Sequence, residues 1–201
     1  MSRAVEEHRY YGVLMGNVIL FISVSLDGYF EGPDHDISWS KVDAELHQDF
    51  NDVLRGMAGL LTGRVTHELM AEVWPTMDED SADTPEEAEF AGIWRDLPKI
   101  VYSRTQSQVD WSTAVRQEID VDEIAALEGD WVVGGPDLAA GFSKLGLIDE
   151  YWIHVHPVLI GQGKPLFPSS EAMVDLQLVE TRAFGNGVVR LRYKRSAPKA
   201  R

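Results

Sequence analysis

The chain contains no cysteine, and that absence excludes several kinds of chemistry at once. It has no disulfides, no thiolate nucleophile and no zinc site built on cysteine. A zinc-dependent base deaminase needs two cysteine ligands beside a His or Cys, so we expect no such unit in this chain. Lack of cysteine also fits a reducing compartment, and we expect a cytoplasmic protein.

Basic residues are scarce as well. Lys and Arg number 18 against 33 Asp and Glu, which gives a formal net charge of −15. A field of that sign repels nucleic acid backbones and anionic lipid surfaces. We therefore expect neither nucleic acid nor a membrane as a partner.

No hydrophobic run is long enough to cross a bilayer. The most apolar stretch, 12–26, is short and is interrupted by Gly16, Asn17 and Ser23. Its β-branched core instead predicts a strand buried on both faces, preceded by an extension.

Strand-like and helix-like segments alternate along most of the chain, which predicts an α/β fold with a mostly parallel central sheet. The tail carries two strand-like runs separated by Gly185, Asn186 and Gly187, a pattern typical of an antiparallel hairpin. We predict an N-terminal extension over 1–16, one domain over 17–195 and a tail over 196–201. After the first strand, strands are expected at 58–62, 99–103, 111–115, 130–133, 151–160, 174–184 and 188–194, and helices at 42–55, 65–74, 86–96, 119–127 and 136–145.

The acidic segment 76–89 has no basic residue. Its composition favours an exposed, solvated loop, and a lid over a binding site is the functional alternative. Val65, Leu69 and Val73 recur at helical spacing before it and support the helix that Pro75 closes.

Three predicted strands end in residues suited to anions. Glycines at such ends let the backbone approach a ligand, helix N-termini attract negative charge, and guanidinium groups bind phosphate. The glycines follow neither the Rossmann nor the Walker pattern, so another nucleotide-binding arrangement is needed. The residues concerned are Gly63, Arg64 and Thr66, then Ser103 and Arg104, then Gly134 and Gly135.

The order of these motifs resembles the dihydrofolate-reductase-like superfamily, most closely stand-alone relatives of the riboflavin-biosynthesis reductase domain. The resemblance covers about residues 17 to 194. Besides the three strand ends, it rests on 25–28 (SLDG), 147–150 (LIDE) and 157–167 (PVLIGQGKPLF). It implies a three-layer dihydrofolate-reductase-like fold and an NADPH cofactor. In that arrangement Arg64 and Thr66 lie near the phosphates, Ser103 and Arg104 near the adenosine 2′-phosphate, and Gly134, Gly135 and Leu138 near the pyrophosphate.

Candidate substrate-side residues follow the first strand. Asp27 is the catalytic candidate, either orienting a substrate N–H or holding a proton donor, although Asp before Gly is also a common turn. Trp39 is expected to cap the nicotinamide cleft or to fill the core. Glu45, or Asp43 beside it, resembles the acid with which dihydrofolate reductases bind a pterin. His154 and His156 share a strand face, but we expect no metal site there and either a packing role or a cleft position for His156 near Pro157.

The resulting hypothesis is hydride transfer from NADPH to a C=N or C=O group of a small heteroaromatic or carbonyl substrate. Val133 stands where the riboflavin-pathway domain usually has Glu before the paired glycines, so the substrate itself stays open. The alternative is a protein that binds or senses a nucleotide without turning it over. Kinship implies a homodimer, for which the strand at 151–160 and the terminal hairpin offer a surface.

Overall fold

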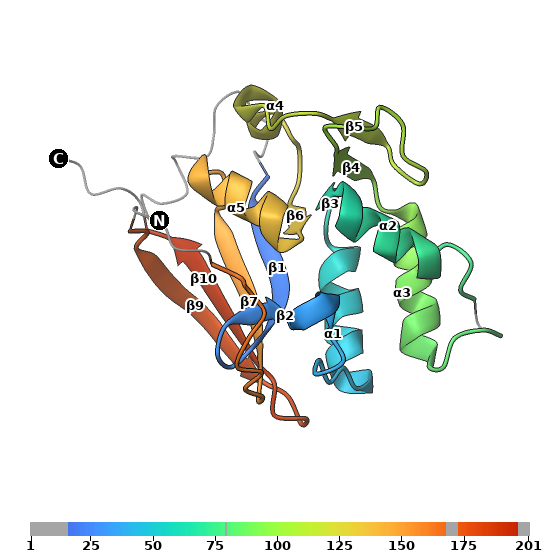
Figure 1. Ribbon diagram of the computed structural model, residues 1–201, viewed down its shortest axis with the longest axis vertical. Coiled ribbons are helices and arrows are strands. Elements are labelled where there is room, and N and C mark those ends of the chain that lie inside the picture. The colour runs from blue at the N-terminus through green and yellow to red at the C-terminus, as the bar shows by residue number, and fades with distance from the viewer. Residues whose placement is uncertain (1–15, 79, 168–172, 197–201) are drawn as a thin grey trace, which may run out of the picture.

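The computed structural model describes residues 16–78, 80–167 and 173–196 (Figure 1). The main sheet contains β1 (Val18–Ser25), β3 (Gly59–Gly63), β4 (Lys99–Tyr102), β5 (Ala114–Arg116), β6 (Trp131–Gly134), β7 (Glu150–His156), β9 (Leu176–Ala183) and β10 (Val189–Arg195). A small second sheet pairs β2 (Tyr29–Glu31) with β8 (Lys164–Pro165). The expected extension and tail lie outside the described residues, apart from Gly16 and Ser196.

The strand order of the main sheet is β5-β4-β3-β6-β1-β7-β10-β9. Every pairing from β5 across to β7 is parallel. β10 runs antiparallel to both of its neighbours, β7 and β9. The predicted mostly parallel sheet with an antiparallel C-terminal hairpin is therefore confirmed.

Helices cover both faces of the sheet (Figure 1). The chain forms α1 (Ala44–Arg55), α2 (Arg64–Val73), α3 (Pro85–Asp96), α4 (Val121–Ala125) and α5 (Pro136–Lys144), together with a short 3-10 turn, Pro33–His35. On one face, Ile124 of α4 and Phe142 of α5 join the largest buried cluster. On the other, Leu54 of α1 and Trp94 of α3 pack with Leu60 and Val132 of the sheet. None of the helices in the described ranges is long and apolar enough to span a membrane.

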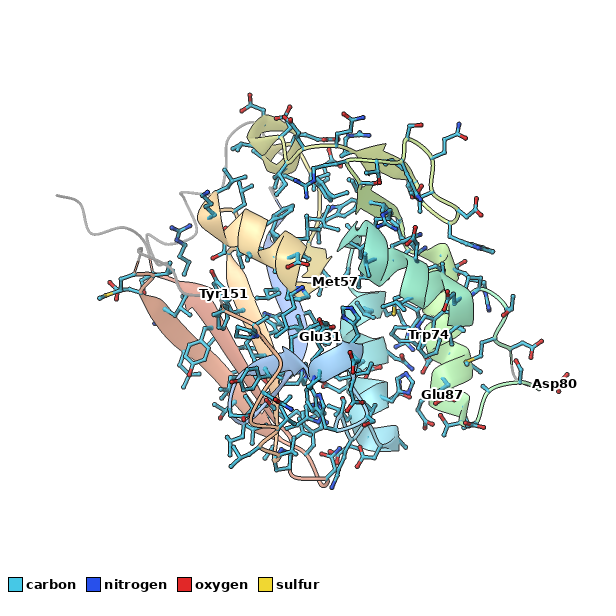
Figure 2. The ribbon with its side chains drawn as sticks, viewed as in Figure 1. Glu31, Met57, Trp74, Asp80, Glu87 and Tyr151 are labelled. Atoms are coloured by element: carbon cyan, nitrogen blue, oxygen red, sulfur yellow. The ribbon has the colours of Figure 1, made fainter. Side chains whose placement is uncertain are left out.

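Up to Thr84 the described part of the acidic segment is a loop, as expected, and the helix expected at 86–96 begins one residue earlier than predicted. α3 begins at Pro85, where the Thr84 side chain accepts a hydrogen bond from the N–H of Glu87. Glu86 and Glu87 then lie in the first turn, where negative charge is favoured by the helix dipole. Asp80, in the part that remains a loop, lies at the outer margin of the molecule in Figure 2.

Two further details differ from expectation. α2 forms as predicted, but Val65, Leu69 and Val73 are its exposed residues, at 53%, 57% and 45%. The helix instead packs through Met70, Ala71 and Trp74. β7 ends at His156, earlier than predicted, because Pro157 has no N–H to continue the ladder.

Candidate functional site

All three predicted anion-seeking turns lie at one edge of the sheet. β3 is the central strand of the three, paired in parallel with β4 on one side and with β6 on the other. Gly63 lies opposite Tyr102, the residue before Ser103, and Thr62 lies opposite Gly134. Parallel strands bring their carboxyl ends to the same edge, which is where ligands of such sheets bind.

The turns after β3 and β6 touch. A Cβ on Gly135 would lie 2.5 Å from the Thr66 hydroxyl oxygen, and a Cβ on Gly63 would lie 3.9 Å from Cβ of Leu138. Gly135 is the N-cap of α5 and Gly63 is the N-cap of α2. Two helices of nine and ten residues thus begin side by side, each with unpaired N–H groups in its first turn.

The two arginines of this edge differ in their surroundings. Arg64 Nη1 lies 2.6 Å from a carboxylate oxygen of Glu68, one turn along α2. Arg104 is exposed and makes no hydrogen bond or ion pair with the described residues. Ser103 is buried, and its hydroxyl oxygen accepts hydrogen bonds from the N–H groups of Thr105 and Gln106. The turn that carries Arg104 is therefore held by Ser103 while its guanidinium stays available.

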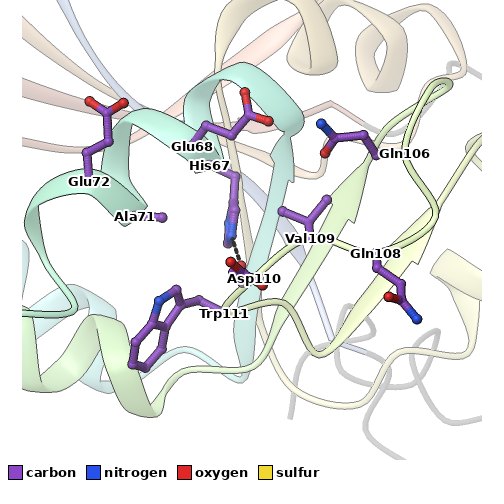
Figure 3. A pocket seen from close by; sticks show the side chains of 9 residues that line it. All are labelled: His67, Glu68, Ala71, Glu72, Gln106, Gln108, Val109, Asp110 and Trp111. Carbon is purple, nitrogen blue, oxygen red and sulfur yellow. Dashed lines mark hydrogen bonds between the residues drawn. The ribbon is translucent and has the colours of Figure 1, made fainter.

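A hollow of about 510 Å³ lies beside this turn, between α2 and the loop that follows Arg104 (Figure 3). Its residues are His67, Glu68, Ala71, Glu72, Gln106, Gln108, Val109, Asp110 and Trp111. A His67 ring nitrogen, Nε2, lies 2.7 Å from the carbonyl oxygen of Asp110 and ties the loop to the helix. Because Glu68, Glu72 and Asp110 line it, the hollow disfavours phosphate, which leaves the glycine turns as the part of the edge suited to bind an anion.

Asp27 follows β1 and supports the loop after β7. Its carboxylate accepts hydrogen bonds from the Ser25 hydroxyl at 2.6 Å and from the N–H groups of Ile160 and Gly161 at 3.3 and 2.8 Å. The Ser25 hydroxyl, followed by these backbone donors, lowers the pKa of Asp27 against a weaker opposing effect of desolvation. The carboxylate is ionised at neutral pH and is an acceptor there, rather than a proton donor.

The structure brings Trp39 and His156 together. Their ring centroids are 5.4 Å apart in an edge-to-face arrangement. The ring nitrogen Nδ1 of His156 accepts a hydrogen bond from the N–H of Lys41 at 3.3 Å. Burial, together with the neighbouring His154, lowers the pKa of His156 to about 4. His156 is therefore neutral around pH 7.

Glu45 contacts the C-terminal hairpin. Its carboxylate accepts a hydrogen bond from the N–H of Gly185 at 2.9 Å and lies 3.6 Å from Arg182. Asp43 is the N-cap of α1 and accepts from the N–H of Leu46. Both acids thus have structural partners, and the geometry does not bring Glu45 to the glycine turns.

The sequence did not predict the buried ionic cluster that joins α1 to the C-terminal hairpin. Asp49 of α1 binds Arg190 at 2.6 Å and Arg182 at 2.5 Å, and its side chain is 4% exposed. Burial would raise the pKa of Asp49, but the neighbouring His154 and then the guanidinium groups of Arg190 and Arg182 together outweigh burial and lower it. His154 Nε2 is 3.7 Å away, too far for a hydrogen bond. In the sequence, Asp49 is a polar residue on an amphipathic helix, and that pattern does not indicate that its side chain is buried.

Thr62 ends the strand predicted at 58–62, but the sequence did not indicate that its hydroxyl is buried. Its hydroxyl oxygen is buried at the carboxyl end of β3 and has no hydrogen-bond partner among the described residues. The residue is 8% exposed and lies opposite Gly134 in the sheet.

No group of three or more His, Asp or Glu suited to a metal ion occurs within the described ranges.

Comparison with known proteins agrees with the fold. Protein YyaP of Bacillus subtilis, which is uncharacterized, is 32% identical over 181 residues, covering 88% of this chain and 93% of YyaP. The structure of a putative riboflavin biosynthesis protein from Shewanella sp. PV-4 superposes with a TM-score of 0.70 at 24% identity, covering 91% of this chain and all of that one.

A Thermotoga maritima diaminohydroxyphosphoribosylaminopyrimidine deaminase/5-amino-6-(5-phosphoribosylamino)uracil reductase gives a TM-score of 0.62 at 12% identity. The match covers 90% of this chain and 57% of the Thermotoga protein. The family described as RibD C-terminal domain matches residues 17–190. With its parallel sheet and C-terminal hairpin, the chain is a dihydrofolate-reductase-like protein that belongs to the RibD C-terminal domain family.

Proposed function

We propose that the protein is an NADPH-dependent reductase that transfers a hydride to a C=N or C=O group of a small heteroaromatic or carbonyl substrate. The observation that carries this proposal is the convergence of the Gly63, Ser103 and Gly134 turns at one sheet edge. The nicotinamide of a bound NADPH supplies the hydride, and the protein supplies position and charge.

The residues of this edge fit a dinucleotide phosphate. Gly135 has no room for a Cβ beside Thr66, so glycine at this position lets the turns after β3 and β6 approach closely. Gly63, Thr66, Gly134 and Gly135 would hold the pyrophosphate at the two helix N-termini, with Leu138 behind them. Arg64 would reach the phosphates by exchanging its ion pair with Glu68, and the orphaned Thr62 hydroxyl is a further polar group at the same edge.

Arg104 and Ser103 are proposed to select NADPH over NADH. A guanidinium binds a phosphate monoester through paired N–H groups, and Arg104 has no ion pair of its own to give up among the described residues. We expect Arg104→Ala to weaken NADPH binding about tenfold or more, with little change for NADH. Arg55→Ala, on the surface of α1, is the control. Fluorescence titration measures the affinity of all three proteins for both cofactors, and equal binding of the two cofactors by the unchanged protein overturns the assignment.

Asp27 is proposed to orient the substrate side of the site as an ionised acceptor. Its hydrogen bonds fix the loop containing Ile160 and Gly161, so it acts on the substrate through position and charge. Trp39, Glu45 and His156 remain the proposed substrate-side residues, although Glu45 is held by the hairpin. We expect Asp27→Asn to lower kcat/KM while NADPH binding persists.

A protein that binds a nucleotide without turnover is the second candidate. The structural hydrogen bonds of Asp27 are the observation that favours it, because they explain this carboxylate without any chemistry. NADPH oxidation with pterins, pyrimidinones or quinones separates the two functions. Turnover above the rate without protein supports the reductase, whereas tight binding without turnover supports the sensor.

We also propose that the protein is a cytoplasmic homodimer. The cysteine-free composition supports a reducing compartment. β9 is an edge strand of the main sheet, and it exposes Leu176, Leu178 and Val179 at 38%, 51% and 47%. Exposed strand edges of this kind pair readily with another chain.

A further inference from the structure

His156 is the last residue of β7, and the ring is completely buried. Its Nδ1 faces the N–H of Lys41 at 3.3 Å. A backbone N–H can only donate, so Nδ1 must be the unprotonated, accepting nitrogen. In a neutral imidazole the proton then sits on Nε2, which makes Nε2 a hydrogen-bond donor.

Within the part of the chain that the structure describes, that donor has no acceptor. Nε2 of His156 is buried and without a hydrogen-bond partner among the described residues. An unpaired buried polar group costs free energy and needs a reason, such as a ligand that supplies the missing partner. His156 pairs with Ser25 of β1 in the sheet. Ser25 stands two residues before Asp27 at the end of its strand, so His156 lies at the same carboxyl edge as the glycine turns.

Trp39 is the movable neighbour of this donor. Its indole meets the imidazole edge to face, but the residue is only half-buried. Trp39 lies between the 3-10 turn Pro33–His35 and α1, in a stretch without helix or strand. Its indole N–H donates to the carbonyl of Asp36, three residues earlier. A turn held by such local contacts can shift without disturbing the sheet.

We infer that His156 is a specificity-determining residue whose Nε2–H donates a hydrogen bond to an acceptor atom of a heteroaromatic substrate, with Trp39 as the side chain that yields to admit it. This inference rests on the proposed reductase function and adds the residue that recognises the ring. The acceptor is a carbonyl oxygen or an unprotonated ring nitrogen, since either can accept from an imidazole N–H.

The charge of the His156 ring determines which kind of acceptor group on the substrate it recognises. Burial and the adjacent His154 hold the pKa of His156 at about 4, so the ring stays neutral through physiological pH. A neutral donor adds no positive charge to offset the desolvation of a carboxylate or phosphate at this buried position, so an uncharged acceptor is favoured. Recognition through His156 should consequently be independent of pH between about 6 and 8.

The first test is nitrogen NMR of the histidine side chains, assigned with His156→Gln. At pH 7 we expect the His156 proton on Nε2, with Nδ1 unprotonated. Saturating 5,6-diaminouracil, which offers carbonyl oxygens, or 4,5,6-triaminopyrimidine, which offers ring nitrogens, is then added in the presence of NADP⁺. One of these probes should shift the Nε2 resonance. A proton on Nδ1, or an Nε2 resonance that responds to neither probe, overturns the inference.

The second test measures affinity for the probe that shifts Nε2. His156→Phe keeps a ring against Trp39 but removes the donor, and we expect binding to weaken about tenfold or more. His156→Gln keeps a donor and should recover part of that loss. His35→Gln, whose side chain is 73% exposed, is the control for loss of a histidine. Unchanged binding by His156→Phe overturns the inference.

A measurement of NADPH binding distinguishes failure of the reductase proposal from failure of the proposed role of His156. If the unchanged protein binds no NADPH, the reductase proposal itself fails. If NADPH binds normally but the His156 tests give the contrary results, only the role of His156 fails.

Discussion

Gly135 meets two constraints that only glycine satisfies. Its φ of +86° and ψ of 132° form a backbone conformation that costs other residues about 1–3 kcal/mol, and a Cβ there would lie 2.5 Å from the Thr66 hydroxyl oxygen. We expect Gly135→Ala to lower the free energy of unfolding by more than the backbone cost alone, and to abolish tight NADPH binding because the α2 and α5 N-termini are pushed apart. Urea unfolding and fluorescence titration measure the two effects.

Gly28→Ala is the matched control for that substitution. Gly28 has a φ of +85°, but an added Cβ would meet nothing within 4 Å. It should show the backbone cost of about 1–2 kcal/mol without the steric one. If both variants lose equal stability and both keep NADPH, the contact between the two turns has no functional importance.

Lys99 is a buried cation at the opposite end of β4 from the site. It is 2% exposed, lies 4.3 Å from the centre of the Trp94 ring and donates to the carbonyl oxygen of Leu97 at 2.7 Å. Burial, opposed by Asp96, lowers its pKa from 10.5 to about 8. Folding therefore disfavours the charged form relative to the unfolded chain.

The pKa of Lys99 makes stability depend on pH in a defined window. Between pH 8 and 10.5 the unfolded chain binds the Lys99 proton more strongly than the folded one, so this residue adds to the free energy of unfolding as pH rises. The difference between the unchanged protein and Lys99→Met should thus grow in favour of the lysine across that window. Urea unfolding at several pH values measures it, and a constant or opposite difference contradicts the pKa.

At the scale of elements, Asp49 fastens α1 to the C-terminal hairpin. Its carboxylate binds Arg190, whose side chain is 8% exposed, and Arg182, which is 43% exposed. Removing one partner of a buried ion pair costs about 3–5 kcal/mol, whereas an exposed pair is worth about 1 kcal/mol or less. We expect Asp49→Ala to destabilise in the first range and Arg182→Ala in the second, by urea unfolding. Similar losses for both would show that the cluster is solvated.

Strand and helix positions could be read from the sequence because their apolar periodicities differ. The parallel order followed from the alternation of elements, and the hairpin from its glycines. Element ends were less accurate when local chemistry decided them. β7 ends at His156, before Pro157, rather than at 160, and Trp111, expected in a strand, has a φ of +60° before β5 begins.

Periodicity did not predict which face of a helix packs on the sheet, or which side chains contact one another. α2 offers two apolar stripes, and only packing against Phe90 and Trp94 decides that Met70 and Trp74 turn inward rather than Val65 and Leu69. The motifs at the strand ends identified the edge, but not the ion pair of Arg64 with Glu68 or the engagement of Asp27 by Ile160 and Gly161. The Asp27 contacts join residues far apart in the sequence whose approach depends on the folded loops, whereas Arg64 and Glu68 are an i,i+4 pair on α2.

At the scale of the whole molecule, a net charge of −15 must coexist with a polyanionic cofactor in the proposed function. The sheet resolves this by gathering two helix N-termini and Arg104 at one edge, whereas part of the acidic segment lies at the outer margin of the molecule (Figure 2). Local fields at short range outweigh the average charge because salt screens distant charges beyond about 8 Å.

The edge strand β9 gives a prediction about assembly. A second copy pairing along it would bury Leu178, which is 51% exposed, and we expect the unchanged protein to have about twice the chain mass of 22.5 kDa. Leu178→Lys places a charge in that contact and should yield a monomer. Leu69→Lys, at an α2 position that is 57% exposed, should leave the dimer intact. Light scattering after gel filtration measures the masses, and a monomeric unchanged protein, or a dimer that survives Leu178→Lys, contradicts pairing through β9.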